Sequence, residues 1–392
     1  MDAPARLAVA WSLTSSAYQV AQWLAARRFL RPRPAPPLPL PVTVLKPLYG
    51  LAGDVPANLE TFCRQDHPDY QIVFGVETEA DPAVPVVRAL MRRFPERDMV
   101  LSVGAGDGTN RKVATLARMM SLARHDLLVL SDADVRVRPD YLRTLVAPLA
   151  DPAVGLSTCL YRGRAIRGLA ARLESLLIDT DFLPMVMLAQ WVQPQRYALG
   201  ASVALRRAAL DAIGGFPALR DHLADDYLLG ERIARAGWHL RLLPHVVETV
   251  IDTPTLRAMW RHQLRWARTN RVSRPVDWFA TILVVHTMLA ATVALLASGG
   301  AVTGWLVLAL ALGCRLGALR TILRLAGARD TLRRLWLVPA KDLLYSALWA
   351  ASWLGRDVEW NGRRLRVLRD GRLELRAPAA PALAGRPVSS AP

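Results

Sequence analysis

The sequence predicts an α/β domain, built on a largely parallel sheet, that is flanked by transmembrane helices. Between residues 42 and 276, short apolar stretches alternate with helical patterns, as in sheets that carry helices on both faces. Apolar stretches close to the length of a bilayer span lie on both sides of this region. Hydrophobic residues make up 52% of the 392 residues, which fits one core plus membrane segments better than two soluble domains.

Charge and cysteine content narrow the class of protein. The formal charge is +17, and many arginines lie beside apolar stretches, as in AARRFLRPRP and RTILRLAGARDTLRR. This placement is typical of the cytoplasmic flanks of membrane segments. Because no recognised nucleic-acid motif accompanies the charge, we expect the lipid bilayer and no nucleic acid as a partner. The three cysteines lack the spacing of a zinc site or a disulfide framework.

The first element is a mostly apolar stretch, residues 7–26, which Arg27 and Arg28 follow. Little positive charge precedes it, so we interpret it as an N-terminal membrane anchor rather than a cleaved signal peptide. Residues 27–41 are rich in proline and arginine and predict a stiff, extended linker.

The predicted sheet domain occupies residues 42–276. Residues 111–124 read as a helix, because Val113, Leu116 and Met120 fall on one stripe. In an open sheet of this kind, ligands bind outside the carboxyl ends of the strands. The candidate strands, in order, are VTVL, QIVFGVE, MVLSV, LLVLS, GLSTCL and ASVALR.

The predicted C-terminal membrane segments occupy residues 279–354. Two of the apolar stretches, FATILVVHTMLAATVALLASG and AVTGWLVLALALGCRLGAL, are each close to the ~20 residues that span a bilayer. Pro339, Lys341 and Asp342 interrupt a third, and four spans would leave the arginine-rich tail outside. This favours either a re-entrant or interfacial third segment or a tail that is an exception to the positive-inside rule. Residues 355–392 are predicted to form a basic tail that is cytoplasmic or flexible.

Two carboxylates end one candidate strand, in LLVLSDADVRV. Side chains alternate along an extended chain, so Asp132 and Asp134 project the same way just past the strand. One interpretation is a turn in which an aspartate caps the backbone. The other is a metal site, because Mg²⁺ and Mn²⁺ prefer carboxylate oxygens and share them with substrate phosphates.

Acidic and basic clusters further along each have two interpretations. Asp225 and Asp226 precede a helical pattern, either as acids favoured by the helix dipole or with a general base among them. In RHQLRWARTNR, His262, Arg265 and Trp266 share a helix face. That face either lies on anionic lipid or caps a leaving diphosphate. Residues 173–191 read equally as an interfacial segment or as a buried core helix.

Nine short motifs occur in an order that resembles the ceramide glucosyltransferases and their bacterial relatives, including the hopanoid-modifying glycosyltransferases. The match runs from about Thr43 to Arg271. Two positions depart from the family: His262 replaces the usual Gln or Arg of the last motif, and Asp134 stands where the eukaryotic enzymes have Gly. The motifs are LKPLYG, NLETF, EADPA, GTNRK, SDADVRVRPDYL, LGASVALRR, GGF, LADDYLLG and HQLRW.

The resemblance implies a GT-A type, Rossmann-like sheet domain and an inverting, UDP-sugar-dependent glycosyltransferase. It implies Asp226 as the catalytic base. A divalent cation, Mg²⁺ or Mn²⁺, is expected at Asp132 and Asp134. The residues expected to bind the nucleotide sugar are Lys46, Glu77, Asp81, Lys112, Asp132, His262, Arg265 and Trp266.

We therefore predict a membrane-bound enzyme that transfers N-acetylglucosamine or glucose from a UDP-sugar to a hydroxyl group of a membrane lipid. The bacterial character of the composition favours a hopanoid polyol as the acceptor. The alternative is a sphingolipid acceptor, as in a ceramide glucosyltransferase that makes glucosylceramide. The expected location is a bacterial inner membrane, multi-pass, with the catalytic domain facing the cytoplasm. A processive polysaccharide synthase and a non-enzymatic basic membrane scaffold are the rival hypotheses.

Overall fold

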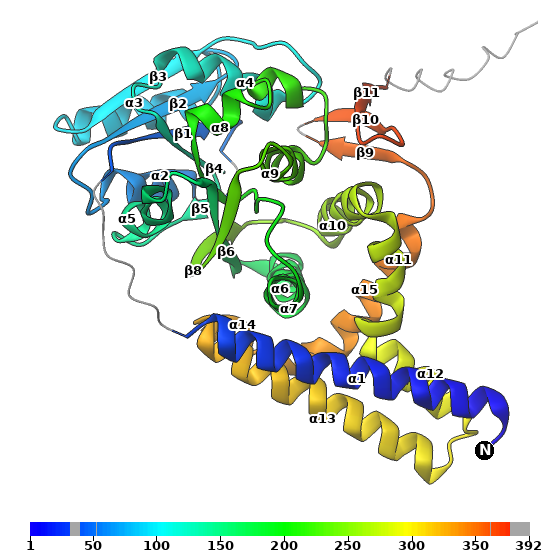
Figure 1. Cartoon of the computed structure of the whole chain (residues 1–392). Helices are drawn as coiled ribbons and strands as arrows, with labels where there is room; N and C mark the ends of the chain where they lie inside the picture. Colours follow the sequence, from blue (N-terminus) through cyan, green and yellow to red (C-terminus); the bar gives the residue numbers. More distant parts are fainter. Residues whose placement is uncertain (32–39, 52, 361, 377–392) are drawn as a thin grey trace, which may run out of the picture.

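The computed structural model describes residues 1–31, 40–51, 53–360 and 362–376. Most of the predicted linker and the end of the predicted tail lie outside the described residues. A mixed α/β sheet domain is joined to a group of long helices (Figure 1). The predicted fold class, a sheet domain of this type accompanied by long apolar helices, is confirmed.

An eight-stranded sheet forms the centre of the domain, in the order β3-β2-β1-β4-β7-β6-β8-β5. The strands from β3 to β4 are parallel, whereas β7 runs antiparallel to both β4 and β6. The carboxyl ends of β1 and β4 therefore lie together at one edge. The strands are β1 (Val42–Pro47), β2 (Tyr70–Val76), β3 (Asp98–Val103), β4 (Leu127–Ser131), β5 (Val135–Arg136), β6 (Val154–Ala165), β7 (Ser202–Arg206) and β8 (His239–Ile251).

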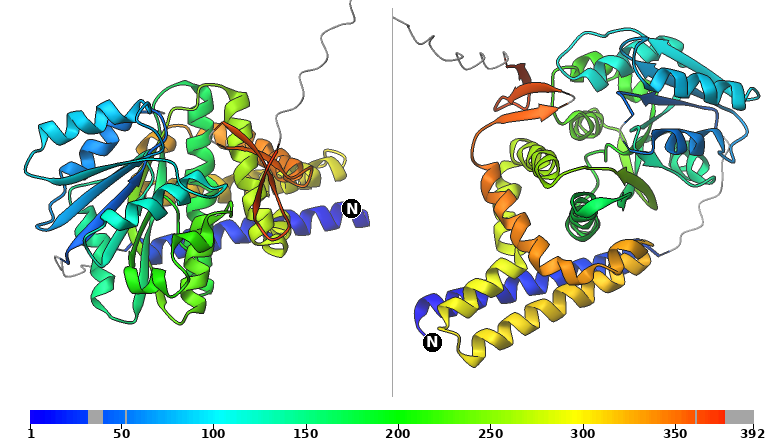
Figure 2. Two further views of the ribbon diagram at one scale, coloured as in Figure 1. Left: turned by 90° about the horizontal axis from the view of Figure 1, so that it is seen from above. Right: turned by 180° about the vertical axis from the view of Figure 1, so that it is seen from behind.

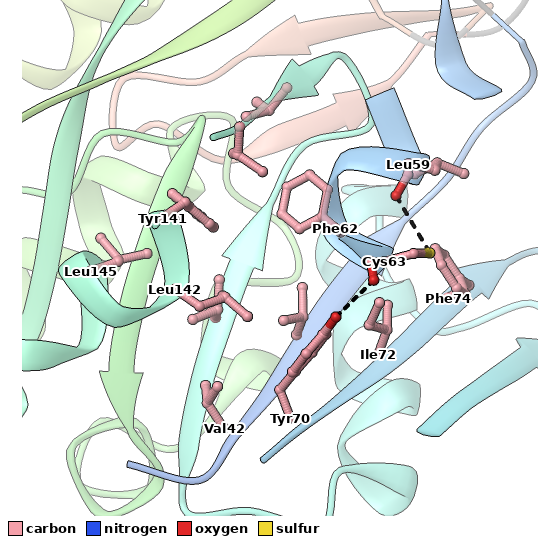
Figure 3. Packing of buried hydrophobic residues seen from close by; sticks show 14 of the residues in the cluster. Val42, Leu59, Phe62, Cys63, Tyr70, Ile72, Phe74, Tyr141, Leu142 and Leu145 are labelled. Carbon is pink, nitrogen blue, oxygen red and sulfur yellow. Dashed lines mark hydrogen bonds between the residues drawn. The ribbon is translucent and has the colours of Figure 1, made fainter. Parts of the chain in front are cut away.

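Different helices cover the two faces of the sheet, because side chains alternate along each strand. Val42 and Val44 of β1 pack in one core with residues of α2, α3 and α5, including Phe62 (Figure 3). Leu45 packs in a second core with α4, α8 and α9. Burial of a side chain such as Phe62 contributes about 1.5–3 kcal/mol. The helices are α2 (Val55–Cys63), α3 (Ala83–Arg93), α4 (Arg111–Met119), α5 (Tyr141–Val146), α8 (Arg207–Asp211) and α9 (Asp225–Arg235).

Strand β8 is absent from the sequence prediction, although it pairs with β6 over most of its length. Pro244 lies in its middle and argues against a central strand. The register shows why the proline is tolerated: Cys159 pairs with Leu243 and Leu160 with Val246. Pro244 and the next residue therefore form a bulge in which no ladder hydrogen bond is needed.

Two helices are long and apolar enough to cross a membrane among the described residues: α13 (Val302–Leu325) and the continuous helical stretch Gly168–Val192. Two-thirds of the apolar window in the second (67%) is buried inside the protein. A bent pair, α11 (Pro275–Val284) and α12 (Thr287–Ala297), meets the same criterion when taken together, with a 50° bend between its halves.

Helix α1 (Ala3–Phe29) contains the predicted anchor, residues 7–26, but is not among these membrane candidates. It packs along α12 and α13 (Figure 1). Polar side chains of α1 bond to α12 and α11: Gln19 Nε2 donates to Thr287 Oγ1 at 2.9 Å, and Trp11 Nε1 donates to the Ile282 carbonyl at 3.1 Å. The serine and glutamine content that lowers its apolarity thus serves helix packing.

The interrupted third apolar segment forms α15 (Val338–Ser352), which does not qualify as a membrane span. After α15, residues of the predicted tail form a three-stranded sheet that lies beside α10 (Leu256–Ser273), on the side of the eight-stranded sheet domain (Figure 2). Leu373 N donates to the Asp221 carbonyl at 2.7 Å, which ties this sheet to the chain before α9. Its strands are β9 (Asp357–Trp360), β10 (Arg363–Val367) and β11 (Leu373–Leu375).

Candidate active site

The two carboxylates that follow β4 lie at the carboxyl edge of the parallel strands. The fully buried Lys46, at the end of β1, donates from Nζ to the Asp132 carbonyl at 2.5 Å and to Ser131 Oγ at 3.4 Å. The Asp134 carbonyl accepts from Val250 N at 2.8 Å. Contacts to their carbonyl groups therefore hold the backbone of both aspartates at this edge.

Lys112 connects these acids with a second acidic pair. Asn110 caps α4, its side chain accepting from Val113 N at 3.2 Å, and this places Lys112 in the first turn. Lys112 Nζ lies 2.7 Å from Asp132 Oδ1 and 3.6 Å from Asp225 Oδ2. Burial alone would lower the pKa of Lys112, but the surrounding carboxylates raise it well above its usual value. This lysine stays charged and holds the two acidic pairs in one cluster.

Asp226 is held by backbone amides at the start of α9. Its Oδ2 accepts from Gly200 N and its Oδ1 from Tyr227 N, both at 2.8 Å. A Cβ atom at Gly200 would lie 2.6 Å from Asp226 Oδ2, so this contact requires glycine. Burial, and then the neighbouring Asp225, raise the pKa of Asp226 to about 6.

The cluster contains more acid than base. Burial, and then repulsion from Asp132, raise the pKa of Asp134 to about 7. Burial lowers the pKa of Lys46 to about 7, although the same carboxylates oppose this shift. Acidic and basic side chains with shifted pKa values at one sheet edge are typical of a functional site.

Helix α10 brings an arginine to the cluster. Burial lowers the pKa of Arg265 to about 10, while Glu174 and then Asp225 and Asp132 favour its charge. The guanidinium carbon lies 5.5 Å from the centre of the Trp360 ring, in the C-terminal sheet. Trp360, in the predicted tail, therefore supplies an aromatic wall that the sequence prediction missed. A cation–π contact with this ring holds the Arg265 guanidinium beside the acids.

The other two predicted residues of this helix turn toward α6 (Gly168–Leu177). His262 Nδ1 contacts the buried Glu174, which also accepts from Gln263 Nε2 at 3.2 Å. Trp266 packs on His262, with ring centroids 5.0 Å apart, and on an apolar cluster that includes Ile251. Glu174 was not predicted, because only the folded chain shows its pairing with α10.

Asp81 and Glu77 lie near the edge but hold other groups. Both carboxylate oxygens of Asp81 accept from Gly50 N at 3.1 Å. Gly50 has a φ of +65°, which glycine adopts without strain. Glu77 pairs with Arg111, the first residue of α4. These contacts shape the loops around the edge, and neither residue is in contact with Asp132 among the described interactions.

The chemistry of the donor set fits a divalent cation. Asp132 and Asp134 supply hard oxygen ligands, and their mutual repulsion would be relieved by a positive ion between them. No group of three or more His, Cys, Asp or Glu side chains is arranged for a metal within the described residues. The remaining ligands would therefore come from phosphate oxygens or water, as is usual for Mg²⁺.

A small cavity of about 20 Å³ lies beneath Lys112, Asp225 and Asp226. It has room for about one water molecule. A cavity of this size cannot hold a nucleotide sugar.

Comparisons with known proteins find glycosyltransferases. The model of the family described as "Glycosyl transferase family 21" matches residues 7–373. Ceramide glucosyltransferase 1 of Caenorhabditis elegans is 24% identical over 236 residues, which cover 60% of this chain and 50% of that protein. Beta-monoglucosyldiacylglycerol synthase of Synechocystis is 27% identical over 219 residues, or 53% of this chain and 43% of that protein. The chain thus spans about half the length, or less, of these curated relatives.

A solved structure shares the fold. It is a mannosyltransferase from Pyrobaculum calidifontis in complex with GDP-mannose and Mn²⁺, with a TM-score of 0.55 and 21% sequence identity. The alignment covers 90% of this chain and 99% of that one.

Proposed function

This chain belongs to glycosyl transferase family 21, and from that premise we propose that it transfers a sugar from a UDP-sugar to a hydroxyl group of a membrane lipid. The observation that carries the proposal is the joining of two distant acidic pairs by Lys112, at 2.7 Å from Asp132 and 3.6 Å from Asp225. This proximity supports the proposal that the base and the diphosphate-binding edge serve one small donor.

Asp226 is the proposed general base. An alcohol is a weak nucleophile at neutral pH, so a carboxylate must take its proton as the new bond forms. The raised pKa of Asp226, about 6, leaves it deprotonated at pH 7 and makes it a stronger base than an exposed aspartate. The alcohol oxygen attacks the anomeric carbon while the bond from that carbon to the UDP phosphate oxygen breaks and UDP departs. This single displacement inverts the configuration at that carbon.

Positive groups at the edge stabilise the departing diphosphate. A divalent cation at Asp132 and Asp134 would neutralise charge on the phosphates. Lys112 keeps Asp132 in place, and Arg265 offers planar, charged donors from the facing helix. Lys46, buried under Asp132, fixes the backbone on which these carboxylates stand.

The proposed acceptor is a two-chain lipid with a primary hydroxyl, with ceramide first and glucose as the sugar. Ceramide glucosyltransferases of C. elegans are among the relatives, which supports the alternative acceptor of the sequence prediction over the hopanoid polyol. The Synechocystis relative makes diacylglycerol the second candidate. None of the relatives reported above is named for a hopanoid substrate.

The test uses purified full-length protein in mixed micelles with Mn²⁺ and radiolabelled UDP-glucose. Ceramide, diacylglycerol and a hopanoid polyol are offered in separate reactions, and the lipid products are identified by mass spectrometry. We expect glucosylceramide from the wild type and at least about a hundredfold less from Asp226→Asn. Transfer to the hopanoid alone would overturn the proposed acceptor. Absence of transfer from any UDP-sugar to any lipid would overturn the proposed reaction.

A further inference from the structure

A second pocket lies where the sheet domain meets the apolar helices, away from the acids described above. Its volume is about 240 Å³. The ends of β6 and β8 form one wall, and the turn between α13 and α14 (Arg329–Leu332) forms the other. Its charged lining residues are Arg162, Arg164, Glu248, Arg329, Asp330 and Arg333.

The pocket carries excess positive charge. Four arginines line it against two carboxylates. Arg162 and Arg164 share Glu248, at 2.6 and 3.0 Å. Arg329 and Arg333 are exposed and have no ion pair among the described residues. Two guanidinium groups are therefore available for an anion from outside the protein.

Buried contacts build the walls of the pocket. Asp179 joins them, because its carboxylate accepts from Gly163 N at 2.7 Å and from Thr331 Oγ1 at 2.5 Å. Arg162 donates to the Ala326 carbonyl at 3.4 Å. Gly327, with a φ of +70°, makes the turn, and a Cβ atom there would lie 3.0 Å from the Arg162 guanidinium. Hydrogen bonds within the fold thus hold the two walls of the pocket together.

The pocket also lies at one end of a candidate membrane helix. It begins at the carboxyl end of α13, one of the two helices long and apolar enough to cross a membrane among the described residues. Leu325 and Trp336, on either side of it in sequence, are 47% and 74% exposed. An exposed tryptophan that follows an apolar helix is typical of the membrane–water interface.

From these observations we propose that the pocket binds the phosphate group of an anionic phospholipid. A guanidinium group matches phosphate with paired, charge-assisted hydrogen bonds, and basic pockets beside membrane helices bind acidic headgroups. A bound lipid would hold the α13–α14 turn against β6 and β8, and so would fix the sheet domain to the membrane surface. Free phosphate has the same chemistry, but the position beside α13 favours a lipid.

The test is native mass spectrometry of the full-length protein in detergent with added phosphatidylglycerol or phosphatidylcholine. We expect the wild type to retain one phosphatidylglycerol and no phosphatidylcholine. The double variant Arg329→Gln/Arg333→Gln should lose at least about tenfold of that adduct, as the loss of charged hydrogen bonds implies. The matched control Arg320→Gln/Arg324→Gln removes the same charge from the exposed face of α13, outside the pocket, and should keep the adduct.

Three results would overturn the proposal. Equal loss in both double variants would mean a general basic surface, and equal retention of the two lipids would mean that charge is not recognised. Complete displacement of the lipid by millimolar inorganic phosphate would make the pocket a site for free phosphate. Melting temperatures equal to the wild type show that the variants are folded. The adduct does not depend on sugar transfer, so failure here is distinct from failure of the proposed function.

Discussion

Two buried charged clusters in this chain use the same residue types in opposite ways. In the helical region, Arg315 and Lys341 each contact both Asp181 and Asp342, at 2.5 to 3.0 Å. All four side chains are at most 4% exposed. Arg315 also donates to Gln19 Oε1 at 2.9 Å. Here two cations meet two anions, and every partner comes from the protein.

The cluster at the sheet edge is not balanced in this way. Four aspartates, at positions 132, 134, 225 and 226, surround Lys46 and Lys112, and the pKa values of Asp134 and Asp226 rise. Buried charge without an internal partner costs stability, so it persists where a ligand or a reaction uses it. We therefore interpret the balanced cluster as structural and the unbalanced cluster as the site of the proposed reaction.

The largest expected effect is on catalysis at the unbalanced cluster. Asp226→Asn removes the proposed base but keeps the size of the side chain. Transfer should fall by about 10²–10⁴-fold, the usual contribution of a general base, while binding of UDP-glucose stays within about twofold. Single-turnover rates and calorimetric binding measure the two quantities. Transfer near the wild-type rate would remove Asp226 from the role.

The balanced cluster should respond through stability. Asp342→Asn leaves Arg315 and Lys341 to share Asp181, and loss of one partner of a buried ion pair costs about 3–5 kcal/mol. Denaturant titration in detergent measures this loss. The control Asp211→Asn, an exposed residue of α8, should change the free energy of unfolding by less than about 0.5 kcal/mol. Equal stability of the two variants would show that the balanced cluster is dispensable.

The pH dependence of transfer should follow the protonation of Asp226 in the unbalanced cluster. Asp226 acts as a base only when deprotonated, and burial raises its pKa to about 6. The rate should therefore be full above about pH 7 and fall about tenfold between pH 7 and pH 5, as the carboxylate is protonated. Initial rates with saturating donor measure this, with melting temperatures at each pH as the control. A rate that stays constant down to pH 5 would contradict the assignment.

The smallest expected effect concerns the aromatic wall behind Arg265. Trp360→Leu removes a ring 5.5 Å from the guanidinium, and a cation–π contact at a partly exposed site contributes about 0.5–1 kcal/mol. Transfer should fall about two- to fivefold, whereas Trp191→Leu, an exposed tryptophan on α7 (Leu183–Val192), should leave it unchanged. Equal rates for the two variants would mean that the C-terminal sheet does not position Arg265.

Continuous apolar runs made much of the sheet predictable from the sequence. The runs before Lys46 and Asp132 form buried strands, and the parallel arrangement brings their ends together. Strand β8 was hidden by Pro244, whose bulge only the pairing with β6 reveals. The short strands β9 to β11 contain no continuous apolar run, and β10 is rich in arginine, so the sequence gave no apolar signal for them.

The candidate site was predictable in part for a related reason. Asp132, Lys112 and Asp226 stand at strand ends or helix starts, where local patterns place them at one edge. Glu174 and Trp360 act through contacts with α10 that are distant in sequence, and no local pattern encodes such pairing. Their positions follow from tertiary packing alone.

The central claim is that the unbalanced cluster at the sheet edge forms a metal-assisted site for a nucleoside diphosphate. Thermal unfolding of the wild type, Asp132→Asn and Asp342→Asn, each with UDP in the presence and absence of Mn²⁺, tests it most directly, because a ligand that binds the folded state raises the melting temperature. We predict that Mn²⁺ increases the shift caused by UDP in the wild type and in Asp342→Asn, from a lower starting temperature, but not in Asp132→Asn. The same Mn²⁺-dependent shift in Asp132→Asn as in the wild type would contradict the account.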